Sequence, residues 1–356
     1  MSSSRQFAPT LVCMAVLVAA FLATGCQSVG PVTVSRDRLD YSNAVAESWK
    51  RQTLLNIVKL RYSDPPLFVD VGQIVGGYTL ETAMSLGVEF DPSGRTDEIG
   101  GSGRFTDRPT ITYVPMTGTD FIVGFLVPVT PATLLSSIKA GWPADIVLRI
   151  GASNINGYVN EEYFAGQFRP PDAEFLRIVE LLRKLQVERL ANFRIKRTAD
   201  STTASLVFSE RSRESHPAAK ELRRLIGLDD DATEAPVIVD DRRTSRGDMV
   251  VKTRSVLAIL QVFSAHVVLP PSHTDSGRAS VGAPDSLDVT ADAFRILSSP
   301  EAPVDAFVAV NYRDTWFYID DRDLASKRHL AILMLLFAVS GTNEDSTGPV
   351  LTIPTG

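Results

Sequence analysis

The clearest pattern in the chain is an alternation of apolar and polar positions over thirteen residues, from Tyr78 to Phe90. The even positions carry the larger, mainly apolar residues, namely Tyr78, Leu80, Thr82, Met84, Leu86, Val88 and Phe90. A period of two over this length predicts one long β-strand with an apolar face. We expect a Gly-rich turn region over residues 91–103 and a paired return strand over residues 104–114. Residues 66–115 are therefore predicted to form one long β-hairpin or a small meander.

Helical periodicity is clearest in residues 172–190, where five apolar residues fall on one face and Glu180 and Lys184 are spaced for an i,i+4 pair. Asp40–Tyr62 is also predicted to be a helix, because Asp64 and two prolines follow it. Two short helices broken by prolines are expected over residues 120–140. The last helix, Leu324–Ser340, is apolar on nearly all sides, so we expect it to lie in the core.

In the second half of the chain a helix is repeatedly followed by strands. The expected units are helix 172–190 with strands near 193–197 and 204–209, helix 217–226 with strands near 236–240 and 248–253, helix 256–268 with strands near 304–312 and 315–320, and helix 324–340 with a strand at 350–354. This order predicts an α+β fold in which helices pack on antiparallel sheets.

Two further segments complete the predicted fold. Strands at 146–155 and 158–164 flank Asn156-Gly157, a strong signal for a two-residue hairpin turn. Residues 270–300 are rich in Ser, Gly, Ala, Pro and Asp, which is typical of a long mobile loop.

The N-terminal residues have the pattern of an export signal. Leu11–Ala23 is free of charge but too short to span a bilayer. The run ends in Leu22-Ala23-Thr24-Gly25-Cys26, which resembles the lipobox of bacterial lipoproteins. This resemblance implies that diacylglycerol is joined to the Cys26 thiol, that the chain is cut before Cys26, and that an N-acyl chain is added. The alternative is an ordinary secretory signal that leaves Cys26 as a free thiol.

The residue after Cys26 indicates which membrane a lipoprotein of this class reaches. Asp at that place is the usual inner-membrane retention signal of Gram-negative lipoproteins, so Gln27 implies the outer membrane, facing the periplasm. The stretch NIVKLRYSDPPLF also resembles proteobacterial envelope lipoproteins, which implies a compartment and no activity. The expected organisation is a signal peptide over residues 1–25 and a short tether over residues 26–39. An N-terminal helix and hairpin region follows over residues 40–165, and a C-terminal α-β-β region over residues 166–356, with its mobile loop at 270–300.

Composition narrows the classes of function. The formal net charge is −6, and it becomes about −7 when residues 1–25 are removed, with 35 basic against 42 acidic residues. A mildly acidic chain is a poor candidate for nucleic-acid binding, which depends on basic surface. No segment after residue 25 is apolar enough to predict a transmembrane helix.

A search for catalytic motifs gives little. Phosphate-binding loops, nucleophile elbows and metal-binding His or Cys motifs are absent from the sequence. Gly100–Gly103 is expected to be a turn. His266 lies among apolar residues and is expected to be a satisfied core or interface histidine, whereas His273 and Asp275 fall in the predicted mobile loop, which argues against a preorganised site.

The acidic residues Asp320, Asp321 and Asp323 form the one weak candidate site, between a predicted strand and the last helix. Carboxylates at this point could bind a cation through oxygen ligands. Alternatively, Asp321 or Asp323 can cap the helix, with Lys327 and Arg328 near enough to pair. We expect the structural role, with no catalytic residue and no metal.

These features favour a non-enzymatic outer-membrane lipoprotein that binds or scaffolds another envelope component. Its expected partners are the lipid bilayer, through the acyl chains on Cys26, and an envelope protein. No cofactor is expected beyond those covalent lipid groups. One alternative is an oligomeric export or pore component that donates a β-hairpin to a barrel, and a second is a metal-dependent hydrolase built on Asp320 and its neighbours.

Overall fold

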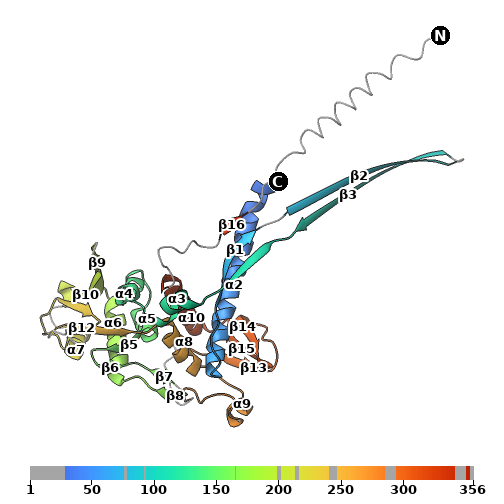
Figure 1. The fold of residues 1–356 in the computed structure, drawn as a ribbon. Helices are drawn as coiled ribbons and strands as arrows, with labels where there is room; N and C mark the ends of the chain where they lie inside the picture. The colour runs from blue at the N-terminus through green and yellow to red at the C-terminus, as the bar shows by residue number, and fades with distance from the viewer. Residues whose placement is uncertain are drawn as a thin grey trace. The chain divides into compact units, whose positions relative to one another are not determined.

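The computed structural model describes residues 29–75, 78–91, 94–164, 166–198, 202–212, 216–239, 247–284, 294–340 and 350–352. The fold is α+β with mostly antiparallel sheets and packed helices, which confirms the predicted class (Figure 1). The chain divides into two compact units. The first comprises residues 1–47, 71–112 and 349–356, and the second comprises residues 48–70 and 113–348.

A long hairpin dominates the first unit. Strands β2 (Tyr78–Asp91) and β3 (Gly94–Asp107) pair along their whole lengths, from Tyr78 opposite Asp107 to Asp91 opposite Gly94 (Figure 1). The predicted strand at 78–90 is confirmed, but the predicted start of its partner at Arg104 is wrong. Gly100–Gly103 lies inside β3 and does not form a turn. Glycine weakens a strand without forbidding it, and the strongly patterned β2 supplies a template on which the glycine-rich stretch can pair.

A second sheet in the described residues contains β16 (Val350–Thr352), β1 (Val69–Val75) and β4 (Thr110–Pro115), in that order. Strands β1 and β16 run parallel, with Gln73 opposite Val350, so the predicted C-terminal strand is confirmed.

Helix α2 (Val29–Arg61) begins eleven residues before the predicted start at Asp40, so residues 29–39, expected as part of a tether, are helical. Pro31 is compatible with this start, because proline is tolerated in the first turn of a helix. At 1.5 Å per residue the 33-residue helix is about 50 Å long. Its C-terminal part, in the second unit, buries Leu54, Ile57 and Val58 completely.

The second unit is built around a six-stranded sheet with the strand order β6-β5-β12-β11-β10-β9. Its strands are β5 (Ala152–Ile155), β6 (Tyr158–Val159), β9 (Ala191–Arg197), β10 (Thr202–Phe208), β11 (Glu234–Ile238) and β12 (Met249–Thr253). Phe193, Leu206 and Ala235 lie opposite one another in register and are buried, whereas Arg194 and Glu234 form an ion pair on the other face. One face of this part of the sheet is therefore covered. The pairing of β11 with β12 is parallel, an exception to the antiparallel prediction.

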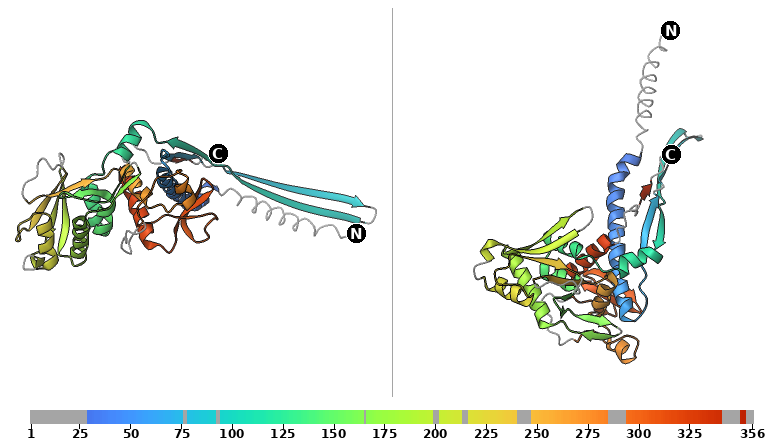
Figure 2. Two further views of the ribbon diagram at one scale, coloured as in Figure 1. Left: turned by 90° about the horizontal axis from the view of Figure 1, so that it is seen from below. Right: turned by 60° about the vertical axis from the view of Figure 1, so that its left-hand side comes forward.

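Helices pack on that covered face, and α6 and α7 lie side by side (Figure 2). The helices of this region are α3 (Gly118–Phe121), the π-helix η1 (Ile122–Leu126), α4 (Pro131–Lys139), α5 (Ala144–Gly151), α6 (Ala173–Val187), the 3-10 helix η2 (Glu210–Ser212) and α7 (Pro217–Leu225). The predicted strand at 146–155 is wrong in its first half, which is α5. A short apolar run fits a buried strand or a buried helix equally well, and Pro143 directly before Ala144 favours the helix start.

The predicted hairpin turn at Asn156-Gly157 is confirmed. Both residues have positive φ angles, 49° and 90°, as a type I′ turn between β5 and β6 requires.

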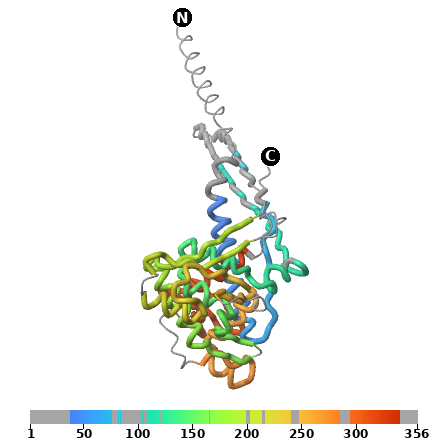
Figure 3. Tube along the Cα trace, turned by 90° about the vertical axis from the view of Figure 1, so that its left-hand side faces the viewer, coloured from blue at the N-terminus to red at the C-terminus, as the bar shows by residue number. Residues whose placement is uncertain are grey.

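The remaining elements form a second layer of the same unit. The three-stranded sheet β13-β15-β14 contains β13 (Leu297–Ser299), β14 (Ala306–Tyr312) and β15 (Thr315–Asp320), and a small hairpin joins β7 (Glu162–Phe164) to β8 (Gln167–Arg169). The helices are α8 (Val256–Ala265), α9 (Pro271–Asp275) and α10 (Leu324–Ser340). As predicted, α10 is a core helix, with Leu330, Ile332, Leu333, Leu336 and Phe337 buried. Residues 270–300 are not one structureless loop, because they contain α9, orange at the edge of the trace in Figure 3, and β13.

Candidate functional site

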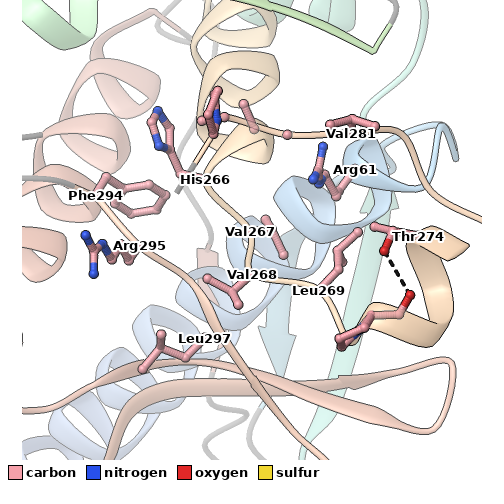
Figure 4. Close-up of a pocket in the computed structure, with 15 residues that line it drawn as sticks. Arg61, His266, Val267, Val268, Leu269, Thr274, Val281, Phe294, Arg295 and Leu297 are labelled. Atoms are coloured by element: carbon pink, nitrogen blue, oxygen red, sulfur yellow. Dashed lines mark hydrogen bonds between the residues drawn. The ribbon is translucent and has the colours of Figure 1, made fainter. Parts of the chain in front are cut away.

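A pocket of about 630 Å³ lies in the second unit, beside the C-terminal end of α8. Its volume falls within the range of about 300–1,000 Å³ that is typical of small-molecule sites. Figure 4 shows Val267, Val268 and Leu269 along its middle, Arg61 near Val281 on one side, and Phe294 and Leu297 on the other. Among the described residues that line the pocket, the side chains that carry or can carry a positive charge are Arg61, His266 and Arg295, and none is acidic.

Backbone hydrogen bonds hold the walls of the pocket. Where α8 ends, the amide of Val268 donates to the carbonyl of Ile296 at 2.8 Å, and the amide of Ile296 donates to the carbonyl of His266 at 3.2 Å. On the opposite side the amide of Ala283 donates to the carbonyl of Ala265 at 3.0 Å. The pocket is therefore bounded by backbone with fixed partners, which is the usual basis for a preformed site.

Arg61 is the last residue of α2 and is only 4% exposed. Its Nη1 donates to the Tyr163 hydroxyl at 2.9 Å, and that hydroxyl donates to the carbonyl of Val281 at 3.2 Å. The Arg61 Nε is buried and has no hydrogen-bond partner. Gly282 packs tightly on the guanidinium, since a Cβ at that position would lie 2.3 Å from Nη2. The guanidinium therefore lies in the wall of the pocket with part of its hydrogen-bonding capacity unused.

His266 lies at the junction of the pocket with a buried ionic cluster. Its Nε2 is 3.1 Å from Glu161 Oε2, and the side chains of the two residues are 10% and 15% exposed. Burial by itself raises the pKa of Glu161, but the hydrogen bond to His266 and the charges of His266, Arg254 and Arg149 outweigh burial and lower that pKa. The prediction that His266 is a satisfied histidine is confirmed.

Arg254 completes this cluster and is 4% exposed. Its Nη1 donates to the carbonyls of Arg149 at 2.8 Å and Ile150 at 3.0 Å, and its Nη2 donates to the carbonyl of Glu161. Two of these carbonyls belong to the last turn of α5, so the cation satisfies a helix C-terminus. Burial lowers the pKa of Arg254 to about 10, against the opposing charges of Glu161 and Glu162.

His273 is placed differently from the prediction. It is 9% exposed, and its Nδ1 lies 2.7 Å from the Tyr62 hydroxyl. Burial raises the pKa of Tyr62 in spite of the nearby charge of Arg313. The assignment of His273 to a mobile loop is wrong, because α9 begins at Pro271 and packs this imidazole against the end of α2.

The three aspartates at the start of α10 have separate structural partners. Asp323 Oδ1 accepts from the amide of Ser326 at 2.9 Å, and Asp321 Oδ1 lies 2.6 Å from Lys327 Nζ. Asp320 Oδ1 accepts from the amide of Arg322 at 2.8 Å. Asp323 is therefore positioned as the N-cap of α10, which agrees with the expected capping role.

Cys26 and Gln27 lie outside the described residues. Among the residues that the structure describes, no group of three or more His, Cys, Asp or Glu side chains is arranged to hold a metal ion. In the same part of the chain, no helix has both the length and the apolar character needed to cross a membrane.

Sequence reasoning missed Arg61, Tyr163 and Glu161 as members of a site. For Arg61 a signal was present, because it lies three and four residues after Val58 and Ile57 and so falls on the buried stripe of α2. A charged residue on an apolar stripe points to a special partner. No comparable signal marks Tyr163 or Glu161, whose place in the cluster depends on contacts with distant residues.

The chain matches no protein-family model, no curated protein and no solved structure.

Proposed function

We propose that this chain is a lipoprotein of the bacterial outer membrane, anchored through acyl chains on Cys26, that faces the periplasm and binds or scaffolds another component of the envelope. The observation that carries the proposal is the apolar run Leu11–Ala23, which ends in the lipobox-like Leu22–Cys26. A two-chain anchor of this kind gives stable attachment, whereas a single acyl chain is marginal.

The first test is acylation of the full chain in a Gram-negative host. Cys26→Ser removes the thiol that would carry diacylglycerol, so we expect metabolic labelling with a palmitate analogue to disappear and a precursor of higher mass to accumulate. Cys13→Ser is the matched control, because Cys13, the other cysteine of the sequence, precedes the expected cleavage point. Label retained on the Cys26→Ser chain would contradict the proposal.

The second test concerns sorting. We expect the wild-type chain to fractionate with outer membrane, and Gln27→Asp to move it to the inner membrane. Gln27→Asn is the control, since it changes the side chain without adding a charge. Wild-type chain in the inner-membrane fraction would refute the sorting assignment but leave the anchor intact.

A second candidate function is an oligomeric export or pore component, and the β2–β3 hairpin favours it. The register places Leu80, Met84 and Leu86 on one face, opposite Phe105, Gly101 and Ile99. On that face no charged residue occurs between the Leu80–Phe105 pair and the Leu86–Ile99 pair, a length of about 20 Å along the strand. The outward apolar band of a membrane barrel is about 25 Å tall. The other face carries Glu81 opposite Arg104.

This second candidate has a test that uses the two faces. In liposomes loaded with dye, a pore predicts release by the wild-type chain, loss of release with Met84→Glu on the apolar face, and retention with Ser85→Glu on the polar face. A chain that is monomeric in mild detergent and releases no dye would exclude the pore and leave the binding or scaffolding role.

A further inference from the structure

Within the part of the chain that the structure describes, Arg61 forms no ion pair with a carboxylate. Its only polar side-chain partner among the described residues is the neutral Tyr163 hydroxyl. Asp64, three residues along the chain, binds Tyr312 and Arg313. Glu161, in the buried ionic cluster, binds His266. A buried cation without an anion is expensive, so buried charges in proteins are normally paired.

The guanidinium of Arg61 also has hydrogen-bond donors that are not used within the protein. A guanidinium has five N–H donors in a rigid fork that suits carboxylate and phosphate oxygens. Here one bond runs to Tyr163, the Nε is buried without a partner, and the residue is more than nine-tenths buried in the pocket wall. An anionic group in the pocket could supply the missing charge.

The rest of the pocket lining is mixed, with His266, Thr274 and Arg295 among otherwise apolar residues. Val267 and Leu269 form its middle and Phe294 and Leu297 its far side, with Phe294 4% and Val267 3% exposed (Figure 4). Arg61 and this apolar side lie at different ends of the same cavity in Figure 4. Arg295 also lies beside Phe294, but it is exposed, so Arg61 is the buried arginine of this lining. A buried cation next to apolar surface fits an amphiphile, since the tail removes apolar surface from water while the head meets the charge.

We propose that this pocket binds a single-chain amphiphile with an anionic head, either a carboxylate or a phosphate. The head lies at Arg61, and the hydrocarbon tail lies over Val267 and Leu269 toward Phe294 and Leu297. This binding activity goes beyond the proposed envelope role and does not depend on the lipid anchor.

The experiment is equilibrium dialysis of the full chain in nanodiscs, with empty nanodiscs subtracted, against four labelled probes. Octanoate and octyl phosphate test the two anionic heads, octanol tests the tail alone, and inorganic phosphate tests the head alone. We expect both anionic amphiphiles to bind at least about 10-fold more tightly than octanol, because hydrogen bonds to a charged group contribute enough for such a ratio. Inorganic phosphate should bind at least about 10-fold more weakly than octyl phosphate, because it lacks the tail.

Variants locate the binding. Arg61→Met should reduce the preference for octanoate over octanol to about 2-fold or less, whereas Arg177→Met, an arginine on α6 outside the pocket, should leave it unchanged. Val281 lines the pocket and is 75% exposed, so its substitution does not depend on refolding of a core. Val281→Asp should weaken octanoate several-fold, and Val281→Lys should not.

Several results would overturn the proposal. Equal affinity for octanol and octanoate would show a plain hydrophobic pocket, and equal affinity for inorganic phosphate and octyl phosphate would show a plain anion site. An unchanged preference in Arg61→Met, or in Val281→Asp if Arg61→Met fails to fold, would place binding elsewhere. Failure of all four probes to bind would also refute the proposal. The acylation of Cys26 is tested separately, by labelling with the palmitate analogue.

Discussion

The start of α10 offers a sharp test of how a carboxylate stabilises this fold. Asp323 Oδ1 accepts from the backbone amide of Ser326 at 2.9 Å, and its Oδ2 accepts from the Ser326 hydroxyl at 2.6 Å. That hydroxyl is completely buried and accepts in turn from the amide of Arg295 at 2.8 Å. Asp323 therefore caps the helix, and through the Ser326 hydroxyl it also helps to hold the backbone at Arg295.

Two substitutions separate these contributions. Asp323→Ala removes the cap, which is worth about 0.5–2 kcal/mol, and leaves the buried hydroxyl hydrogen without an acceptor, which costs about 1 kcal/mol, so the total loss should be about 1.5–3 kcal/mol. Asp323→Asn keeps an oxygen for the Ser326 amide. Its NH₂ group cannot accept from the Ser326 hydroxyl, which already receives the Arg295 amide, so Asn should restore the cap but lose about 1 kcal/mol.

Urea unfolding of the purified chain, followed by circular dichroism, measures these differences. Asp321→Ala is the matched control, because its side chain is 60% exposed and its pair with Lys327 should contribute less than about 1 kcal/mol. Calcium or magnesium should not raise the melting temperature of the wild type or of any of the three variants. If Asn destabilises as much as Ala, or if divalent cations stabilise wild type and not Asp323→Asn, the carboxylate serves a metal and the capping argument fails.

Two further predictions concern the buried ionic cluster. Because folding lowers the pKa of Glu161, its carboxylate contributes stability that is full above the unfolded value of about 4.3 and is lost as the pH falls through the lower folded pKa. Glu161→Gln should therefore flatten the acid limb of urea midpoints measured between about pH 6 and pH 2, and an unchanged slope would contradict the assignment. Arg254→Met should destabilise the chain by about 3 kcal/mol or more, because it leaves three carbonyls without a donor and the Glu161 charge without a partner. Arg177→Met should cost much less, because it changes an exposed ion pair. Equal losses in the two variants would show that the Arg254 contacts are not stabilising.

Local pattern was sufficient for the elements with a strong period or a strong turn. Local signals were sufficient to predict strand β2, helix α10 and the Asn156-Gly157 turn. Alternating residues indicate the strand, a continuous apolar segment indicates the core helix, and an Asn-Gly pair favours the positive φ angles of the turn. Strand β3 was not, since its glycines carry no pattern and their conformation is set by pairing with β2. Helix α5 was missed for a related reason: its eight residues are too few to distinguish the period of a helix from that of a strand.

The pocket was beyond local reasoning because its walls come from distant parts of the chain. A backbone hydrogen bond joins Val268 to Ile296, which are 28 positions apart in the sequence. The Tyr163 hydroxyl donates a hydrogen bond to the carbonyl of Val281, which is 118 positions away. Residues 270–300 were predicted to be a loop because they are rich in Ser, Gly, Ala, Pro and Asp. Described residues in this range, such as Ala283 and Ile296, nevertheless have fixed backbone partners, which no composition argument can anticipate.

Two buried arginines show how a structural charge differs from one that is open to a ligand. Arg254 and Arg61 are both 4% exposed, so both bear the cost of removing a guanidinium from water. Arg254 recovers that cost through three carbonyl acceptors and the nearby Glu161. Arg61 recovers less, because it has one neutral hydroxyl and an Nε without a partner. On the stripe formed by Ile57 and Val58, an apolar side chain of similar length would serve folding at least as well. Folding alone therefore accounts for the arginine at 254 and not for the one at 61, and the difference is what an anion in the pocket would supply.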